Sequence, residues 1–176
     1  MKKAAFLDRD GVINRKAPED QYVTRWADME FLPGTCEAIR LLNDAEFLVV
    51  VVSNQRCVAK GLITTEDLES MHARMCREFH AVGANIDAVF YCPHDYQPPC
   101  DCRKPKPGML LDAARAHDIQ LAASWMIGDS GHDVQAGRNA GCKTAQVVAD
   151  EQSASGGPDL VANSLLDATH KILQVD

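Results

Sequence analysis

The feature that most constrains the fold is an alternation of short apolar segments with longer amphipathic ones. Residues 47–52 are apolar at every position, which is typical of a strand buried on both faces of a parallel sheet. Residues 64–82 instead carry apolar side chains at helical spacing, behind a capping-box pattern formed by Thr64 and Asp67. The alternation predicts an α/β fold: a Rossmann-like parallel sheet with helices on both faces.

The same patterns divide most of the chain into expected elements. We expect strands at residues 3–8, 47–52, 87–92, 124–128 and 143–148. We expect helices at residues 34–45, 64–82, 107–117, 134–140 and 164–173, the last preceded by a Ser- and Gly-rich loop at 153–158. A length of 176 residues fits one domain, so we take residues 1–176 as a single unit.

Charge and cysteine content restrict the partners and the compartment. The net charge of −7 argues against nucleic acid as a partner, because proteins that bind it usually expose a basic surface. No apolar run approaches the roughly 20 residues of a membrane span, and residues 1–8 are too short and too soon charged for a secretory signal. The seven cysteines are an odd number, unlike a secreted disulfide framework. We expect a cytoplasmic protein without membrane contact, and a monomer.

Polar residues follow the expected strands, and ligands of open α/β sheets bind beyond the carboxyl ends of the strands. The segments after successive strands contribute Asp8 and Asp10, then Ser53 and Asn54, then Arg103 and Lys104, then Asp129 with Asp133 one turn later. Carboxylates, a hydroxyl group and cations should therefore converge on one rim of the sheet.

This set of side chains suits phosphoryl transfer. A carboxylate can attack phosphorus and form an acyl phosphate, and a second carboxyl group can protonate the leaving group and later activate water. Magnesium prefers oxygen ligands, and a lysine neutralises phosphate charge. Each residue alone is explained as well by a turn, a helix cap or a surface charge. Their order after successive apolar strands is what indicates a site.

The polar segments also resemble a known family. The segment FLDRDGV at residues 6–12, then Ser53, Lys104, and Gly128-Asp129-Ser130 with Asp133 are similar, in this order, to the four motifs of the haloacid dehalogenase (HAD) superfamily. The resemblance spans nearly the whole chain and leaves no gap large enough for a separate cap domain. It implies a magnesium-dependent phosphatase with a covalent phospho-aspartate intermediate.

The resemblance also implies a role for each matching residue. The nucleophile, which is also a magnesium ligand, is Asp8. The general acid and base is Asp10, which lends its backbone carbonyl to the metal. Ser53 and Lys104 hold the transferring phosphoryl group, Asp129 completes the magnesium site, and Asp133 holds Lys104 or a water near the metal.

A second cluster combines cysteine with histidine. Cys92-Pro93-His94 and Cys100-Asp101-Cys102 are separated only by residues 95–99. Thiolates and one imidazole make a closed tetrahedral zinc set from Cys92, His94, Cys100 and Cys102. Because this set leaves no position for water, we expect a structural zinc that orders the loop 92–102 and holds Arg103 and Lys104 over the site. The alternative is a chance cluster of reduced cysteines.

The loop narrows the resemblance to the heptose bisphosphate phosphatases, whose substrate is D-glycero-D-manno-heptose 1,7-bisphosphate. The segments similar to that family are residues 11–14, 22–23, 53–55, 58–61, 92–94, 100–105 and 107–109. The resemblance implies removal of the 7-phosphate in bacterial heptose and lipopolysaccharide synthesis. Arg56-Cys57 departs from a Ser-Gly pair usual in that family, and Ser130 departs from a lysine found in some members. We expect Asn54, Arg103 and Arg56 to bind substrate, with a plain surface charge as the alternative for Arg56.

Other functions remain open at this stage. Histidinol-phosphate phosphatases share the zinc loop, some DNA 3′-phosphatases share the fold, and a zinc-stabilised binding module would have lost catalysis. The acidic charge argues against DNA, and the intact motif residues argue against a binding module. A rim carrying Arg56, Lys60, Arg103 and Lys106 should favour a bisphosphorylated sugar and repel the amine and imidazole of histidinol phosphate.

Overall fold

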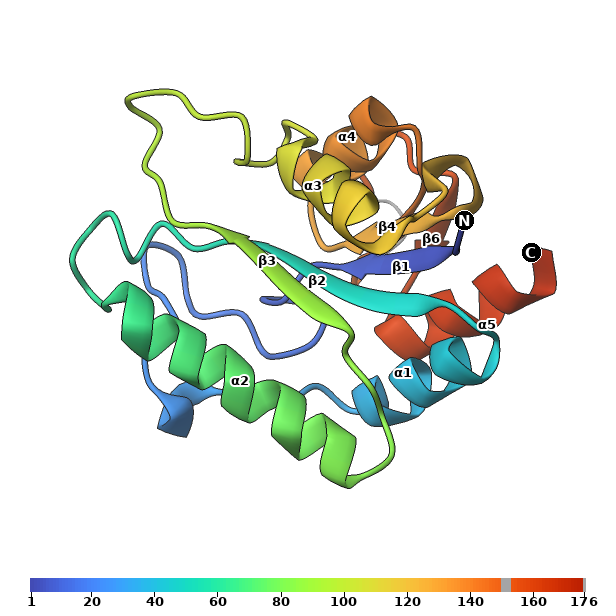
Figure 1. Cartoon of the computed structure of the whole chain (residues 1–176), viewed down its shortest axis with the longest axis horizontal. Helices are drawn as coiled ribbons and strands as arrows, with labels where there is room; N and C mark the ends of the chain where they lie inside the picture. The colour runs from blue at the N-terminus through green and yellow to red at the C-terminus, as the bar shows by residue number, and fades with distance from the viewer. Residues whose placement is uncertain (150–152, 176) are drawn as a thin grey trace.

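The computed structural model describes residues 1–149 and 153–175 and contains a six-stranded sheet (Figure 1). The strands, all paired in parallel, are β1 (Ala4–Leu7), β2 (Leu48–Asn54), β3 (Ala88–Cys92), β4 (Trp125–Gly128), β5 (Lys143–Val147) and β6 (Leu160–Ala162). Their order in space is β3-β2-β1-β4-β5-β6. The predicted α/β fold with a parallel sheet is confirmed.

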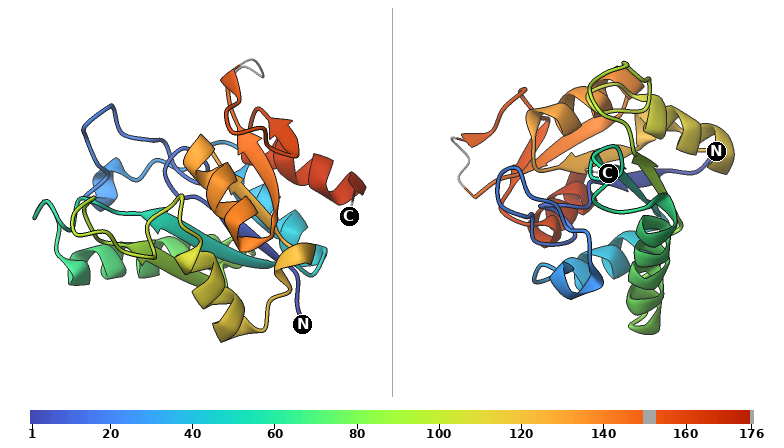
Figure 2. Two further views of the ribbon diagram at one scale, coloured as in Figure 1. Left: turned by 90° about the horizontal axis from the view of Figure 1, so that it is seen from above. Right: turned by 90° about the vertical axis from the view of Figure 1, so that its left-hand side faces the viewer.

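Helices cover both faces of the sheet (Figures 1 and 2). They are α1 (Thr35–Asp44), α2 (Thr65–Ala81), α3 (Gly108–His117), α4 (Gly131–Ala140) and α5 (Leu165–Val175). Alternate residues of a strand point to opposite faces. Ala5 and Leu7 of β1 belong to the core shared with α1, α2 and α5, whereas Ala4 and Phe6 pack in the core shared with α3 and α4. Burial on both faces explains the unbroken apolar runs that predicted the strands.

Three local features differ from the sequence-based expectation. The short strand β6 lies in a region expected to form only a loop and a helix, because three residues are too few to establish a periodicity. Helix α4 begins at Gly131 rather than at residue 134, because Ser130 and Asp133 form a capping box there. Short 3-10 helices at Trp26–Asp28 and Leu121–Ala123 were also not predicted.

The topology creates a crevice between β1 and β4. The chain moves outward from β1 to β2 and β3, then returns to place β4 on the other side of β1. Ligands of open α/β sheets bind at such a switch point. The register pairs Leu7 with Ile127, so Asp8 and Asp129 emerge close together from neighbouring strands. The fold therefore brings together the segments that follow the strands.

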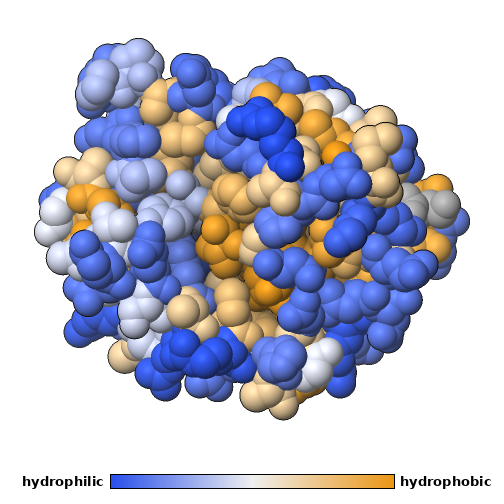
Figure 3. Space-filling model, viewed as in Figure 1, coloured by the Kyte–Doolittle hydropathy of each residue, from blue (hydrophilic) through white to orange (hydrophobic). Residues whose placement is uncertain are grey.

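The face of the molecule drawn in Figure 3 is mainly hydrophilic. Hydrophobic residues gather near the middle of the face shown in Figure 3, where the half-buried edge strand β3 runs in the same view. Among the residues that the structure describes, no helix is both long and apolar enough to cross a membrane.

Candidate active site

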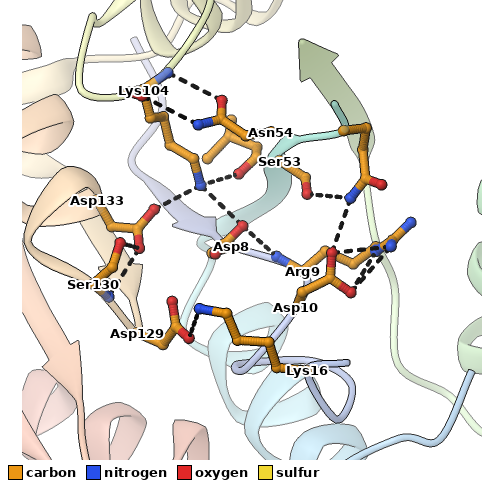
Figure 4. Close-up of polar contacts among 12 residues, drawn as sticks. Asp8, Arg9, Asp10, Lys16, Ser53, Asn54, Lys104, Asp129, Ser130 and Asp133 are labelled. Atoms are coloured by element: carbon orange, nitrogen blue, oxygen red, sulfur yellow. Dashed lines mark hydrogen bonds and ion pairs between the residues drawn. The ribbon is translucent and has the colours of Figure 1, made fainter. Parts of the chain in front are cut away.

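The polar residues that follow the strands meet in one open cavity of about 500 Å³ (Figure 4). Its lining includes every residue expected to act in catalysis, substrate binding or magnesium binding, namely Asp8, Asp10, Ser53, Asn54, Arg56, Arg103, Lys104 and Asp129. These residues come from several strand ends and from the loop after β3. The tertiary structure thus assembles the whole expected set in one place.

A buried lysine lies at the centre of the site. The ammonium group of Lys104 lies 2.9 Å from Oδ1 of Asp8 and 2.6 Å from Oδ1 of Asp133, and it donates to the carbonyl of Val52 at 2.8 Å. Its side chain is only 2% exposed. Burial opposes the charge, but the carboxylates of Asp133 and Asp8 raise the pKa of Lys104 above its usual range. The lysine therefore stays charged inside the protein.

The site holds more carboxylates than this one lysine neutralises. Oxygen atoms of Asp8, Asp129 and Asp133 lie within 4.8 Å of one another. Burial raises the pKa of Asp8 to about 7; Lys104 opposes the rise, and the charges of Asp133 and Asp129 add to it. Burial also raises the pKa of Asp129. Such a cluster is stabilised by a further cation.

The donor set fits magnesium, which prefers oxygen ligands. Asp133 is already engaged, because its Oδ1 binds the lysine and its Oδ2 accepts from the hydroxyl of Ser130 at 2.6 Å. Asp8 and Asp129 are left for a cation. Gly11 makes room for this arrangement, since a Cβ at this residue (φ +93°) would lie 2.3 Å from Oδ2 of Asp129.

Asp10 is held by a separate set of donors. Arg9, which is fully buried, contacts Oδ1 and Oδ2 of Asp10 through Nη2 at 3.0 Å each. Asn14 donates to Oδ1 at 2.9 Å, and Gln55 donates to Oδ2 at 3.0 Å. Burial opposes ionisation, but Arg9 and these amides lower the pKa of Asp10. Asp10 is therefore ionised before a ligand enters.

A buried histidine lies behind this arginine. Nε2 of His72, on α2, lies 3.0 Å from Nη1 of Arg9. Burial and the charge of Arg9 lower the pKa of His72 from its ordinary 6.5 to about 3. The imidazole is therefore neutral at physiological pH. The sequence pattern assigned no role to His72, because only the fold shows its distance to Arg9.

Ser53 and Asn54 lie at the end of β2 and use their side chains differently. The hydroxyl of Ser53 accepts from Gln55 at 2.7 Å, which leaves its own hydrogen free to donate into the cavity. The amide of Asn54 is bound to the backbone of Lys104, donating to its carbonyl at 3.1 Å and accepting from its N–H at 3.0 Å. Asn54 thus lines the cavity and also fixes the loop that carries the lysine.

The cavity rim carries cations, although not all of those expected. Arg56 pairs with Asp95 at 2.6 Å, and the guanidinium groups of Arg56 and Arg103 both lie over the ring of Tyr96. Lys60 and Lys106 are not among the lining residues, contrary to expectation. Lys60 lies over the ring of Tyr22, and Lys106 pairs with Asp101.

Lys16 is a lining residue that sequence inspection missed. Its ammonium group lies 2.7 Å from Oδ2 of Asp129. Lys16 belongs to the long irregular segment after β1, where no periodicity indicates which side chains point inward. Only the folded path of this segment brings Lys16 to the cavity (Figure 4).

The cysteine and histidine residues of the loop also come together. The Sγ of Cys92 lies 3.6 Å from Nδ1 of His94 and 3.6 Å from Sγ of Cys100. Cys102 lies 3.2 Å from His94 and 3.5 Å from Cys100. Zinc–sulfur bonds of about 2.3 Å in a tetrahedron imply ligand separations of about 3.7 Å, so the cluster fits zinc. Arg103, next along the chain, donates to the carbonyl of His94 at 3.3 Å.

Comparison with known proteins points to one family. The HAD-hydrolase-like family model matches residues 101–168. A D-glycero-beta-D-manno-heptose-1,7-bisphosphate 7-phosphatase from Bordetella bronchiseptica is 39% identical over 95% of this chain and 90% of its own length. The enzyme of the same name from Rhodopseudomonas palustris is 42% identical over 78% of this chain and 79% of its own length.

Solved structures agree with the sequence comparison. The crystal structure of D,D-heptose 1,7-bisphosphate phosphatase from B. bronchiseptica, complexed with magnesium and phosphate, superposes with a TM-score of 0.89, at 37% identity and 99% coverage of both chains. The corresponding phosphatase from Burkholderia thailandensis superposes with a TM-score of 0.71, at 33% identity, over 98% of this chain and 99% of that one.

The thiol cluster generates a prediction about metal content. We expect Cys102→Ser to lose zinc that the unaltered protein retains through gel filtration, and to melt at a lower temperature, because the loop gains its order from the metal. Elemental analysis and thermal unfolding measure both effects. Cys36→Ser, outside the cluster, is the matched control and should keep its zinc. Absence of zinc from carefully purified unaltered protein would contradict the prediction.

The buried imidazole generates a prediction about acid stability. The pKa of His72 is lower in the folded protein than in the unfolded chain, so the unfolded chain takes up the proton first as the pH falls. The contribution of neutral His72 to folding stability is therefore complete above pH 6.5 and is lost at lower pH. Between pH 6.5 and pH 5 the loss should be about 2 kcal/mol. Urea unfolding of His72→Gln, which cannot titrate, should show a correspondingly weaker pH dependence. Parallel curves for the two proteins would refute this.

Proposed function

Because the chain belongs to the D-glycero-beta-D-manno-heptose-1,7-bisphosphate 7-phosphatase family of HAD-like hydrolases, we propose that it hydrolyses the 7-phosphate of this sugar bisphosphate through a phospho-aspartate on Asp8. One observation carries the mechanism. Oδ1 of Asp8 is held by Lys104 at 2.9 Å and by the backbone N–H of Arg9 at 2.8 Å. Oδ2 is therefore the oxygen left to attack phosphorus.

In the first step, Oδ2 of Asp8 forms a bond to phosphorus and the bond from phosphorus to the sugar oxygen breaks. The electron pair of the broken bond goes to the sugar oxygen, which takes a proton from Asp10. Asp10 is ionised at rest, so it must first take up a proton from solvent as the substrate binds, and the phosphate dianion beside it favours this protonated form. The hydroxyl of Ser53 and the ammonium of Lys104 hold the phosphoryl oxygens during transfer.

In the second step, Asp10 acts as a base instead of an acid. Its carboxylate takes a proton from a water molecule, whose oxygen attacks the phosphorus of phospho-Asp8. The bond between phosphorus and Asp8 breaks, inorganic phosphate leaves, and the carboxylate of Asp8 is restored. The same residue thus serves as acid and then as base, as the two halves of the reaction require.

Magnesium would be held by the carboxylates of Asp8 and Asp129 and by the backbone carbonyl of Asp10, and it would supply charge neutralisation and orientation of the phosphate. The related enzyme from B. bronchiseptica was crystallised with magnesium and phosphate. Asp133 supports this arrangement from the side, since it neutralises Lys104 and leaves Asp8 and Asp129 available.

The substrate assignment rests on the rim of the cavity. Lys16, Arg56 and Arg103 line it in addition to Lys104, with Lys16 paired to Asp129 and Arg56 to Asp95. The second phosphate of a sugar bisphosphate would be bound by Arg56 and Arg103, whose guanidinium groups both lie over the ring of Tyr96. Histidinol phosphate would present an amine and an imidazole to these cations, so it is the weaker alternative. The acidic chain makes a DNA 3′-phosphatase weaker still.

We propose that residues 1–176 act as one catalytic domain, that the zinc is structural, and that the enzyme works as a monomer in the cytoplasm without nucleic acid or membrane as partner. A small phosphorylated metabolite, a net charge of −7 and the absence of an apolar spanning run support this setting.

The proposed nucleophile can be tested directly. Asp8→Asn should lose essentially all turnover, because an amide oxygen cannot attack phosphorus, while circular dichroism shows a folded protein. The loss should exceed about 10⁴-fold, as expected when a covalent nucleophile is removed. Phosphate release measures the rate, and intact-mass spectrometry after an acid quench should detect phospho-Asp8 only in the unaltered enzyme. Near-normal turnover in folded Asp8→Asn would exclude Asp8 as the nucleophile.

The proposed substrate can be tested by comparing catalytic efficiencies on different substrates. We expect kcat/KM for the heptose 1,7-bisphosphate to exceed that for histidinol phosphate by at least about 100-fold, the effect of roughly 3 kcal/mol from a bound second phosphate. Fructose 1,6-bisphosphate controls for charge alone. Higher efficiency on histidinol phosphate would overturn the assignment. Equal efficiency on the fructose compound would reduce the function to a general sugar-bisphosphate phosphatase.

A further inference from the structure

The buried arginine next to the nucleophile has an unusual environment. Among the described residues that are fully buried, Arg9 is the largest. Its side chain lies between the carboxylate of Asp10, with Nη2 3.0 Å from Oδ2, and the ring of His72, with Nη1 3.0 Å from Nε2. The proposed mechanism uses Asp10 and leaves His72 without a role.

The chemistry of this contact dictates the state of the histidine. A guanidinium group has donors and no acceptor. Nε2 of His72 must therefore accept from Arg9, and the proton of the neutral ring must be on Nδ1. Nδ1 is buried and has no hydrogen-bond partner within the described part of the chain. An unsatisfied buried N–H is destabilising, so this tautomer is retained for the contact with Arg9.

The surroundings hold the ring in place. His72 lies on α2 with only 4% of its surface exposed, and its ring packs edge-on against Tyr91 at 5.6 Å between centroids. A ring fixed by a helix and a strand is a rigid acceptor. Without it, the Nη1 donors of Arg9 would be buried with nothing to bind on this side, and the guanidinium group would turn toward another acceptor.

A rotation of the guanidinium group would displace the carboxyl group of Asp10, the proposed catalytic acid. Arg9 contacts both oxygens of Asp10, whereas Asn14 and Gln55 each contact one. Arg9 binds through Nε as well as Nη2, so the plane of its guanidinium group, together with the two amides, constrains the plane of the carboxyl group. A displacement of about 1 Å in a reacting group is enough to lower a rate about 100-fold.

We infer that His72 is a positioning residue for catalysis: by accepting a hydrogen bond from Arg9, it fixes the guanidinium plane that orients the carboxyl group of Asp10. The inference rests on the proposed role of Asp10 as general acid and base. It adds a residue on α2, outside the HAD-like motifs, to the machinery of the reaction. Its action is indirect, since His72 touches neither phosphate nor metal.

The role inferred for His72 predicts that its loss affects substrates differently according to their leaving groups. A sugar alkoxide is a poor leaving group and needs a proton from Asp10, whereas p-nitrophenolate leaves without one. A misoriented Asp10 should therefore slow the first step for the sugar phosphate and spare it for p-nitrophenyl phosphate. A general loss of structure would lower kcat/KM for both substrates together.

The experiment compares His72→Leu, which removes the acceptor, with His72→Gln, whose amide oxygen restores it. For His72→Leu we expect kcat/KM to fall about 10-fold or more on the heptose bisphosphate and less than about 3-fold on p-nitrophenyl phosphate. The larger fall is a part of the roughly 10²–10⁴-fold rate enhancement that general acid catalysis supplies. His72→Gln should recover most of the loss. His80→Leu, an exposed change on the same helix, should behave like the unaltered enzyme.

A second measurement does not depend on turnover. Nitrogen-15 NMR of the unaltered protein should show His72 with its proton on Nδ1 and a bare Nε2. A protonated Nε2, an equal loss on both substrates, or failure of glutamine to restore activity would each overturn the inference, even if His72→Leu did not fold.

Asp10→Asn is measured alongside to separate this inference from the proposed function. If Asp10→Asn discriminates between the two leaving groups and His72→Leu does not, only the role of His72 is wrong. If Asp10→Asn fails to discriminate, the proposed role of Asp10 is wrong and the inference falls with it.

Discussion

The buried ammonium group of Lys104 is the interaction on which the rest of the site depends. It neutralises Asp8 and Asp133 at 2.9 and 2.6 Å and ties them to the carbonyl of Val52 in β2. Removing one partner from a buried ion pair typically costs about 3–5 kcal/mol, because the other charge stays buried without compensation. The lysine thus joins β1, β2 and the start of α4 into one site, and its charge opposes the rise that burial causes in the pKa of Asp8, the proposed nucleophile.

The remaining features of the site follow from the placement and charge of this lysine. Lys104 lies just after the thiol cluster, so a loop with no hydrophobic core of its own must be ordered before the lysine can point inward. The cysteine and histidine cluster gathers the loop on one side, and Asn54 binds the backbone of Lys104 from the other. The excess of carboxylates that remains explains both the fit to magnesium and the approach of Lys16 to Asp129. The fold of the loop and the excess of carboxylates therefore both require a cation at this end of the sheet.

Sequence patterns predicted much of this arrangement, and the residues that they missed have a common cause. Asp8, Ser53 and Asp129 could be identified because each comes at the end of a short apolar run, and the carboxyl ends of parallel strands meet by geometry. Lys16 lies on an irregular segment, where position along the chain says nothing about direction. His72 lies on a helix far from the motifs in sequence, and its contact with Arg9 exists only after α2 packs against the sheet. The strand β6 was too short for its periodicity to show.

The sequence by itself determined the fold class, the cysteine and histidine cluster and the residues at the ends of the strands. These depend on local periodicity, on the spacing of cysteine and histidine, and on the rule that parallel strands end at one edge. Only the tertiary structure decided which cations line the cavity and how each carboxylate is held. Arg56 and Arg103 share the ring of Tyr96, Lys106 pairs with Asp101, and Asp10 is hydrogen-bonded by a buried arginine. The physical reason is that charge pairing depends on distances of a few ångströms between segments distant in sequence, and a sequence pattern carries no such distances.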